Sequence, residues 1–193
     1  MLDNLKKYKI FLASKSPRRQ EILKMLRIPF TVITIPGIDE SFPSDLPLQE
    51  IPSFISQKKA DAYMERLVEN DLIITADTMV ICDNRIIGKP KDAEEAKEML
   101  SFLSGKTHQV ATGVSISTHS KRKTFTSISD VTFATLTKEE IEYYVDNFSP
   151  LDKAGAYGIQ EWIGGVAVSS IEGSFYNVVG LPVHRLYSEL KKF

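Results

Sequence analysis

Residues 14–19 (SKSPRR) combine hydroxyl groups and cations at a predicted strand-to-helix junction. The first N–H groups of a helix are unpaired and carry about half a positive charge. Arg18 and Arg19 add positive charge at this end, where negative charge would be stabilising. A phosphate bound by the N–H groups, the guanidinium groups and the hydroxyls of Ser14 and Ser16 would remove the conflict. The alternative is that both arginines are helix formers with solvated charges, and this segment alone leaves both interpretations open.

Other charged side chains could complete a site for phosphate chemistry. Asp77 follows the apolar run 71–76, and open α/β sheets bind ligands beyond the carboxyl ends of their strands. A carboxylate there can hold Mg²⁺ or Mn²⁺ or orient a water, although taken alone a turn or N-cap aspartate is the commoner case. Glu40 adds an acidic oxygen in a long loop. Lys89 is available for phosphate, but an exposed lysine before a proline is usually only solvated.

Several other patterns are interpreted as structural. Residues 105–107 (GKT) end like a Walker phosphate loop, but Leu100 stands where that motif requires glycine. Cys82 is flanked like a strand residue that enters a turn, and an inert cysteine is the expected interpretation. No G-x-S-x-G segment for a serine hydrolase occurs. Three histidines lack metal-ligand spacing and are assigned to packing or the surface: His108, His119 and His184.

The composition is that of an ordinary globular protein. The 193 residues are 42% hydrophobic and 25% charged, which suits one domain, either undivided or in two lobes. A net charge of −1 gives no global field that favours nucleic acid or an anionic membrane as partner. The single cysteine excludes an intramolecular disulfide and fits a reducing compartment. With no signal-peptide pattern and no apolar run near 18 residues, we expect a cytoplasmic protein outside the membrane.

Hydrophobic periodicity and turn signals predict the elements that position these side chains. Strands are expected over residues 9–14, 30–35, 71–76, 110–116 and 124–135, with a hairpin over 79–87. Helices are expected from Pro17, over 48–68, over 92–104, after the Thr137–Glu140 capping box and over 182–190. Strands and helices alternate early and a β-rich middle follows. This order predicts an α/β domain with a mixed sheet.

These segments, in this order, resemble the Maf family of nucleotide pyrophosphatases. The resemblance covers nearly the whole chain, and its most specific parts are residues 14–19 together with residues 151–160. The matching positions are residues 14–19 (SKSPRR), Glu40 in GIDE, Lys59 in QKKA, 76–78 (ADT), 88–90 (GKP), 103–105 (LSG) with 107–108 (TH), 151–160 (LDKAGAYGIQ) and 179–182 (VGLP).

The resemblance implies a fold and an activity. The fold is an elongated, two-lobed α/β domain with a central cleft, shared with inosine-triphosphate pyrophosphatases and spanning residues 1–193. The activity is hydrolysis of a nucleoside triphosphate between its α- and β-phosphates, dependent on a divalent cation such as Mg²⁺ or Mn²⁺. A homodimer is compatible with the family by analogy only.

Family roles map onto this sequence by position. Asp77 is the implied proton acceptor, and Asp77 or Glu40 would hold the metal; which carboxylate does which is left open. The implied phosphate-site residues are Ser14, Ser16, Arg19, Lys59 and Lys89. If Arg19 serves only the phosphates, its removal should barely change stability, because a like charge leaves the helix N-terminus.

Substrate choice is implied by Arg18, Thr78 and Gln160. A related branch of the family, which acts on 7-methyl-GTP, typically has an aromatic residue, glutamine and glutamate at these positions. Glutamate only accepts hydrogen bonds, which matches guanine, whereas glutamine donates and accepts, which matches uracil or thymine. The resemblance therefore implies dTTP and UTP, including modified pyrimidine nucleotides. Two alternatives stay open: a pyrophosphatase for another nucleotide, purine or modified, or a nucleotide-binding regulator of cell division.

Overall fold

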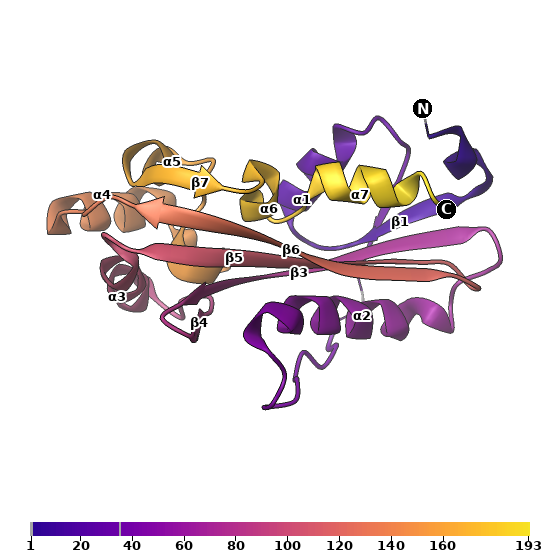
Figure 1. The fold of residues 1–193 in the computed structure, drawn as a ribbon, viewed down its shortest axis with the longest axis horizontal. Coiled ribbons are helices and arrows are strands. Elements are labelled where there is room, and N and C mark those ends of the chain that lie inside the picture. Colours follow the sequence, from indigo (N-terminus) through magenta and orange to yellow (C-terminus); the bar gives the residue numbers. More distant parts are fainter. Residues whose placement is uncertain (1, 35) are drawn as a thin grey trace. The chain divides into compact units, whose positions relative to one another are not determined.

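The computed structural model describes residues 2–34 and 36–193, and within them one mixed sheet organises the chain (Figure 1). Its strand order is β2-β1-β3-β5-β6-β7, and β4 pairs with β3 outside that path. The strands are β1 (Lys9–Ala13), β2 (Thr31–Ile33), β3 (Asp71–Cys82), β4 (Arg85–Ile87), β5 (Thr107–Ser117), β6 (Arg122–Phe133) and β7 (Val168–Glu172). β1 runs parallel to β2 and β3, whereas the pairs β3–β4 and β6–β7 are antiparallel. The predicted α/β class with a mixed sheet is confirmed.

Local sequence signals explain where the helices begin. Asp92 accepts a hydrogen bond from Glu95 N at the start of α3, and Thr137 and Glu140 form a complete capping box at the start of α4. The helices are α1 (Pro17–Lys24), α2 (Ile51–Met64), α3 (Ala93–Leu103), α4 (Lys138–Phe148), α5 (Trp162–Val166), α6 (Phe175–Val179) and α7 (Val183–Leu190), with short 3-10 turns η1 (Asp3–Lys7), η2 (Leu48–Glu50), η3 (Pro150–Asp152) and η4 (Ala154–Ala156). None of the helices in the described ranges is both long and apolar enough to cross a membrane.

The chain divides into two compact units, each made of separate segments. The first unit contains the residues up to Asp77, residues 112–127 and the residues from Gly180 onward, and the second contains residues 78–111 and 128–179. The long strands β3, β5 and β6 therefore contribute residues to both units.

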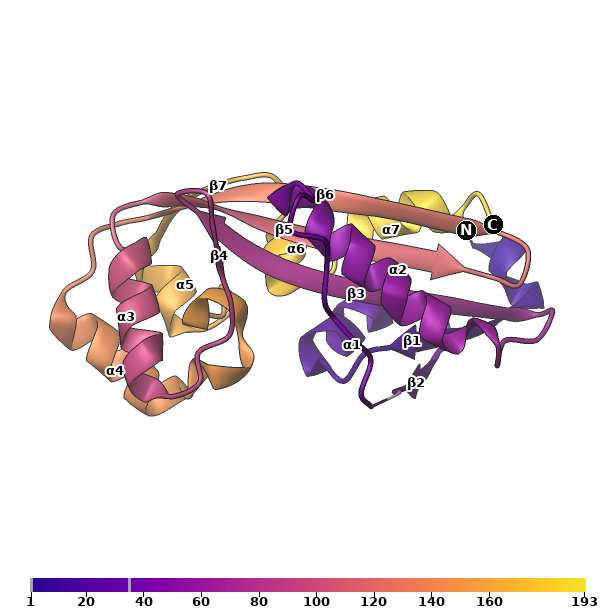
Figure 2. The same cartoon turned by 90° about the horizontal axis from the view of Figure 1, so that it is seen from below.

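In the first unit, α2 and α7 cover opposite faces of the sheet (Figures 1 and 2). The two ends of the chain belong to this unit and are hydrogen-bonded to each other. Asn4 Nδ2 donates to the carbonyl of Leu190 at 2.8 Å, and Lys7 Nζ donates to the carbonyl of Phe193 at 3.3 Å.

In the second unit, α3, α4 and α5 group together around a hydrophobic core (Figure 2). Leu100, Leu103 and Ile163 are fully buried there, and Tyr144 is the largest of the fully buried side chains. His108 also belongs to this interior, with Nε2 2.7 Å from the hydroxyl of Tyr157.

The structure differs from the predicted elements at several places, and α5 and α6 were not predicted at all. β3 continues through Asp77 to Cys82, although a strand end was expected at residue 76. The helix expected over 48–68 begins with a 3-10 turn and ends at Met64. Residues 110–116, expected to be half-buried, are buried on both faces. β7 lies in a glycine-rich stretch for which no strand was predicted.

Gly113 in β5 makes the close approach of α2 possible. A Cβ added at Gly113 would stand 2.1 Å from Pro52 C and from Ser53 N, so the helix backbone would have to move. We expect Gly113→Ala to lower the free energy of unfolding by about 3 kcal/mol, measured by urea denaturation. Gly165→Ala is the matched control, because a Cβ there meets nothing within 4 Å. Equal effects of the two substitutions would contradict this explanation.

Candidate active site

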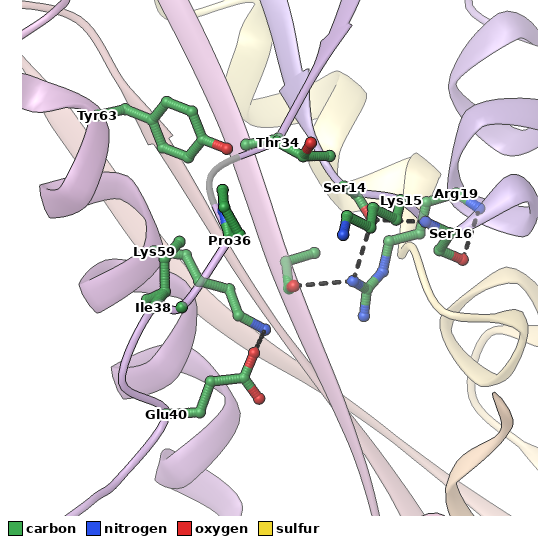
Figure 3. A pocket seen from close by; sticks show the side chains of 13 residues that line it. Ser14, Lys15, Ser16, Arg19, Thr34, Pro36, Ile38, Glu40, Lys59 and Tyr63 are labelled. Carbon is green, nitrogen blue, oxygen red and sulfur yellow. Dashed lines mark hydrogen bonds and ion pairs between the residues drawn. The ribbon is translucent and has the colours of Figure 1, made fainter.

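A pocket of about 310 Å³ lies in the first unit, where β1 ends and α1 begins (Figure 3). Two groups of polar side chains face each other across it: the residues of the β1–α1 turn on one side, and Lys59 with Glu40 on the other. The lining residues are Ala13, Ser14, Lys15, Ser16, Arg19, Thr34, Pro36, Gly37, Ile38, Glu40, Lys59, Tyr63 and Ala76. Five of the residues predicted from sequence are therefore brought together here: Ser14, Ser16, Arg19, Glu40 and Lys59.

The hydroxyls of the β1–α1 turn shape the start of α1. Ser16 is the N-cap, and its Oγ accepts from Arg19 N at 3.4 Å. Ser14 Oγ accepts from Ser16 N at 3.2 Å, which folds the chain back directly after the strand. Pro17 fills the first helical position, where its missing N–H costs nothing. The turn presents a helix N-terminus and two hydroxyls to the pocket, which is the arrangement that binds phosphate oxygens.

Arg19 is held by the backbone as well as facing the pocket. Its Nε donates to the carbonyl of Gly180 at 2.8 Å, and its Nη1 donates to the carbonyl of Ala76 at 2.8 Å. Burial lowers the pKa of the Arg19 guanidinium, and the nearby Asp77 carboxylate partly opposes this effect. The two backbone carbonyls thus stabilise part of the positive charge at the helix N-terminus, a role that neither of the two sequence interpretations, a bound anion or solvation, included.

We therefore revise the expected effect of removing Arg19. Arg19→Ala leaves two carbonyls without this donor and should lower the free energy of unfolding by about 1–3 kcal/mol. Lys15→Ala, an exposed cation of the same turn, should leave stability almost unchanged. Thermal melts and urea titrations of both variants test this, and equal stability of the two would show that the carbonyl contacts contribute little.

On the other side of the pocket, one lysine joins the two predicted metal ligands. Lys59 Nζ lies 2.7 Å from Asp77 Oδ1 and 2.9 Å from Glu40 Oε1. The side chains of Lys59 and Asp77 are 15% and 14% exposed, whereas that of Glu40 is 57% exposed. The Lys59–Asp77 pair is thus largely shielded from water, whereas Glu40, which also pairs with Lys59, is exposed to solvent.

Asp77 is not at the end of its strand, as the sequence analysis assumed. β3 runs on through Asp77 to Cys82, and its last residues, 80–82, pair with β4 in a hairpin. Parallel pairing of β1 with β3 nevertheless reaches only Leu12 opposite Ile74. Asp77 therefore lies beyond the paired end of β1, on the side where the β1–α1 turn begins, and the expected ligand-binding edge is retained.

The two carboxylates fit a divalent cation that also binds substrate. Asp77 and Glu40 already converge on one positive charge, the ammonium group of Lys59. In residues 2–34 and 36–193 there is no cluster of three or more His, Cys, Asp or Glu side chains that could form a complete protein cage. Mg²⁺ is commonly held by one or two carboxylates together with substrate phosphates, which matches this pair.

Asp77 contacts the lining residue Lys59 but does not itself line the pocket, and four other predicted residues also lie outside the lining. Arg18 is partly exposed on α1, next to Arg19. Thr78, Lys89 and Gln160 belong to the second unit, where Lys89 and Gln160 are exposed and Thr78 is partly buried in β3. Conversely, Tyr63 lines the pocket and was not predicted. Its spacing of four residues from Lys59 along a helix was the available signal.

Three features that the sequence analysis interpreted as structural, the GKT segment, Cys82 and His108, are held by packing or ion pairs in the structure. Lys106 of the GKT segment pairs with Asp83 at 2.8 Å and lies over the ring of Phe102. Burial raises the pKa of the Cys82 thiol, as expected for an inert cysteine. Burial lowers the pKa of His108 to about 4, so this histidine is neutral at pH 7 and packs in the core.

The fold is that of an α/β protein with a mixed sheet, and its pocket brings together hydroxyls, cations and a helix N-terminus, which are groups that bind phosphate in many proteins. The model of the family described as "Maf-like protein" matches residues 9–193, and the chain belongs to this family. A protein of Bacteroides thetaiotaomicron named "dTTP/UTP pyrophosphatase" is 56% identical over 192 residues, which cover 100% of both chains. A protein of the same name from Porphyromonas gingivalis W83 is 54% identical over 195 residues, which cover 100% of this chain and 98% of the relative.

The fold is shared with a more distant solved structure. The "HAM1 protein from Coxiella burnetii" is 14% identical, with a TM-score of 0.50 over 96% of this chain and 100% of that chain. At this identity the likeness concerns the fold alone. It agrees with the architecture that the family resemblance predicted from sequence.

Proposed function

We propose that this protein is a nucleoside triphosphate pyrophosphatase that converts dTTP and UTP to the monophosphates and pyrophosphate. The observation that carries the proposal is that Lys59, which lines the pocket of the β1–α1 turn together with Glu40, pairs with both Glu40 and Asp77. Membership of the Maf-like family and relatives more than half identical over their full length, named for this activity, support it. The single cysteine, Cys82, fits work in a reducing compartment, and we place the enzyme in the cytoplasm.

The pocket suggests how the chain's own groups act on the triphosphate. The N–H groups and hydroxyls of the β1–α1 turn bind phosphate oxygens, and Lys59 neutralises their charge. Asp77 accepts the proton of a water that attacks the α-phosphorus, while the bond from that phosphorus to the bridging oxygen breaks and pyrophosphate leaves. A divalent cation held by Asp77, Glu40 and phosphate oxygens would add charge neutralisation at the leaving group. Roles for Lys89 on phosphate and for Arg18 and Thr78 in substrate choice rest on their positions in the family motifs.

The choice of a pyrimidine is assigned to Gln160, which predicts the effect of Gln160→Glu. The amide both donates and accepts, whereas a carboxylate only accepts and would leave a base carbonyl unpaired beside a charge. We expect kcat/KM for dTTP and UTP to fall by roughly tenfold to a hundredfold, while GTP loses less or gains. The measurement is the ratio of kcat/KM for dTTP to that for GTP.

The control Gln57→Glu makes the same substitution at an exposed position of α2. Its ratio of kcat/KM for dTTP to kcat/KM for GTP should equal that of the wild type. If Gln160→Glu lowers hydrolysis of all three nucleotides by one factor, Gln160 does not read the base. The pyrimidine assignment would then depend on Arg18 and Thr78 alone.

A nucleotide panel tests the activity itself. Purified protein is incubated with Mg²⁺ or Mn²⁺ and with ordinary and modified pyrimidine and purine triphosphates, and pyrophosphate and monophosphate are measured. Preferred turnover of dTTP and UTP is the expected result. Preferred turnover of a purine or modified nucleotide would replace the substrate assignment, and tight binding without turnover would favour a nucleotide-binding regulator.

A further inference from the structure

The segment around Gln160 is a tight turn in which Gln160 itself is exposed. Glu161 N donates to the carbonyl of Gly158 at 2.9 Å, so Ile159 and Gln160 are its two central residues. Ile159 is 6% exposed and packs into the core of the second unit. Gln160 is the one exposed residue of residues 158–161. Gln160 is thus the most exposed side chain of a turn whose other residues are buried or, like Glu161 with a side chain 21% exposed, only partly exposed.

One buried phenol holds both ends of this turn. Tyr144 of α4 is fully buried, and its ring stacks on Phe148. Its hydroxyl accepts from Gly158 N at 3.0 Å and donates its proton to the carboxylate of Glu161. Burial, together with the hydrogen bond to Glu161, raises the pKa of Tyr144, so the hydroxyl keeps the proton that this second bond needs.

Two further contacts fix the turn. Lys153, whose side chain is 9% exposed, pairs with Glu161 at 3.1 Å and so balances its charge. Gly164 of α5 lets the helix press against the turn, because a Cβ there would lie 1.8 Å from the carbonyl of Ile159. A Cβ at Gly158 would lie 2.9 Å from Gln160 Nε2, so the amide itself rests against the turn.

We propose that Tyr144, Glu161 and Lys153 are positioning residues that orient the Gln160 amide toward the base of the substrate. The inference rests on the proposed function, in which Gln160 reads the base. Binding costs entropy when the loop that carries a contact residue must become ordered, and a backbone that is already ordered avoids this part of the cost. The base lies away from the reacting phosphorus, so its contacts with the enzyme are the same in the ground state and in the transition state. A less ordered turn should therefore weaken binding of both states equally, which raises KM and leaves kcat unchanged.

The test is Tyr144→Phe, which keeps the ring and removes only the hydroxyl. We expect KM for dTTP to rise about tenfold with kcat within about twofold, and kcat/KM for GTP to change less than twofold. Tyr143→Phe is the control, because it removes the hydroxyl of a half-exposed tyrosine one residue away on the same helix, where the ring packs on Trp162. In a Gln160→Ala background, Tyr144→Phe should cause no further change in the dTTP/GTP ratio, since its effect passes through Gln160.

Amide hydrogen exchange provides a readout that does not depend on activity. Tyr144→Phe should speed exchange at the Gly158 amide by about tenfold or more, with the core of α3 unchanged. An unchanged dTTP/GTP ratio, or an equal loss for both nucleotides, overturns the positioning role, as does unchanged exchange at Gly158. If Gln160→Ala alone leaves the ratio of the wild type, the base-reading part of the proposed function fails. That result comes from a different variant, so the two failures are distinguishable.

Discussion

Asp77→Asn is expected to lower turnover of the best nucleotide substrate by roughly a thousandfold, within the range for removal of a general base. The substitution keeps the shape of the side chain but removes its charge, so proton acceptance from water and binding of a divalent cation both weaken. Folding should survive, because Lys59 retains Glu40 at 2.9 Å and the new amide oxygen can still accept from it. Steady-state kinetics at saturating substrate and metal, together with a thermal melt, measure the two effects separately.

Asp39→Asn is the matched control for this experiment. Asp39 is an exposed neighbour of Glu40, and it pairs with Lys58 at 2.8 Å and not with Lys59. The control should keep activity within about twofold, as is usual for a surface change away from the site. Near-normal turnover of purified Asp77→Asn would exclude Asp77 as the proton acceptor.

Lys59→Met is expected to lower kcat/KM by at least about a hundredfold, because charge stabilisation dominates phosphoryl transfer. Lys59 is the cation between Asp77 and Glu40, and it lines the pocket assigned to the phosphates. Methionine keeps most of the length and apolar contacts of the stem but leaves the carboxylate of Asp77, which is 14% exposed, without this partner. Stability should therefore fall as well as activity, since one partner of a shielded ion pair is removed.

Lys58→Met and the double variant Lys59→Met/Asp77→Asn separate these two effects. Lys58 is the preceding residue of α2 and pairs with Asp39, so its loss should leave kcat/KM within about twofold. The double variant removes the unpaired charge and should regain part of the lost stability while remaining inactive. Full activity of Lys59→Met would remove this lysine from the site.

The fold class and the β1–α1 side of the pocket could be predicted from the sequence, because both depend on patterns of neighbouring residues. Ser16 at the N-cap and Pro17 at the first helical position are adjacent in the sequence, and together they predict where the β1–α1 turn ends and α1 begins. The contact of Lys59 with Asp77 joins residues 18 positions apart. The family motifs assigned both residues to the site, but the ion pair between them was not predicted.

What could not be predicted depends on contacts between distant segments. The carbonyl of Gly180 that accepts from Arg19 is 161 residues away in the sequence, so the structural role of Arg19 was missed. Asp77 was placed at a strand end because a charge after an apolar run usually marks one, whereas pairing with β4 keeps β3 extended. Burial of β5 on both faces likewise depends on distant segments, because in the first unit α2 and α7 cover opposite faces of the sheet, and α2 packs closely enough to require Gly113.

The hydrogen bonds between the first and last segments of the chain indicate that the protein can be circularly permuted. The last carbonyls of a helix lack partners within it, and Asn4 supplies one to Leu190 near the end of α7. Deleting the first few residues would therefore let the last turn of α7 fray. Because Asn4 contacts Leu190 and Lys7 contacts Phe193, a short flexible linker is enough to connect these two segments, and the chain can be opened at the exposed Asp83–Asn84 turn. Such a circular permutant would keep every strand pairing while moving the ends from the first unit to the second.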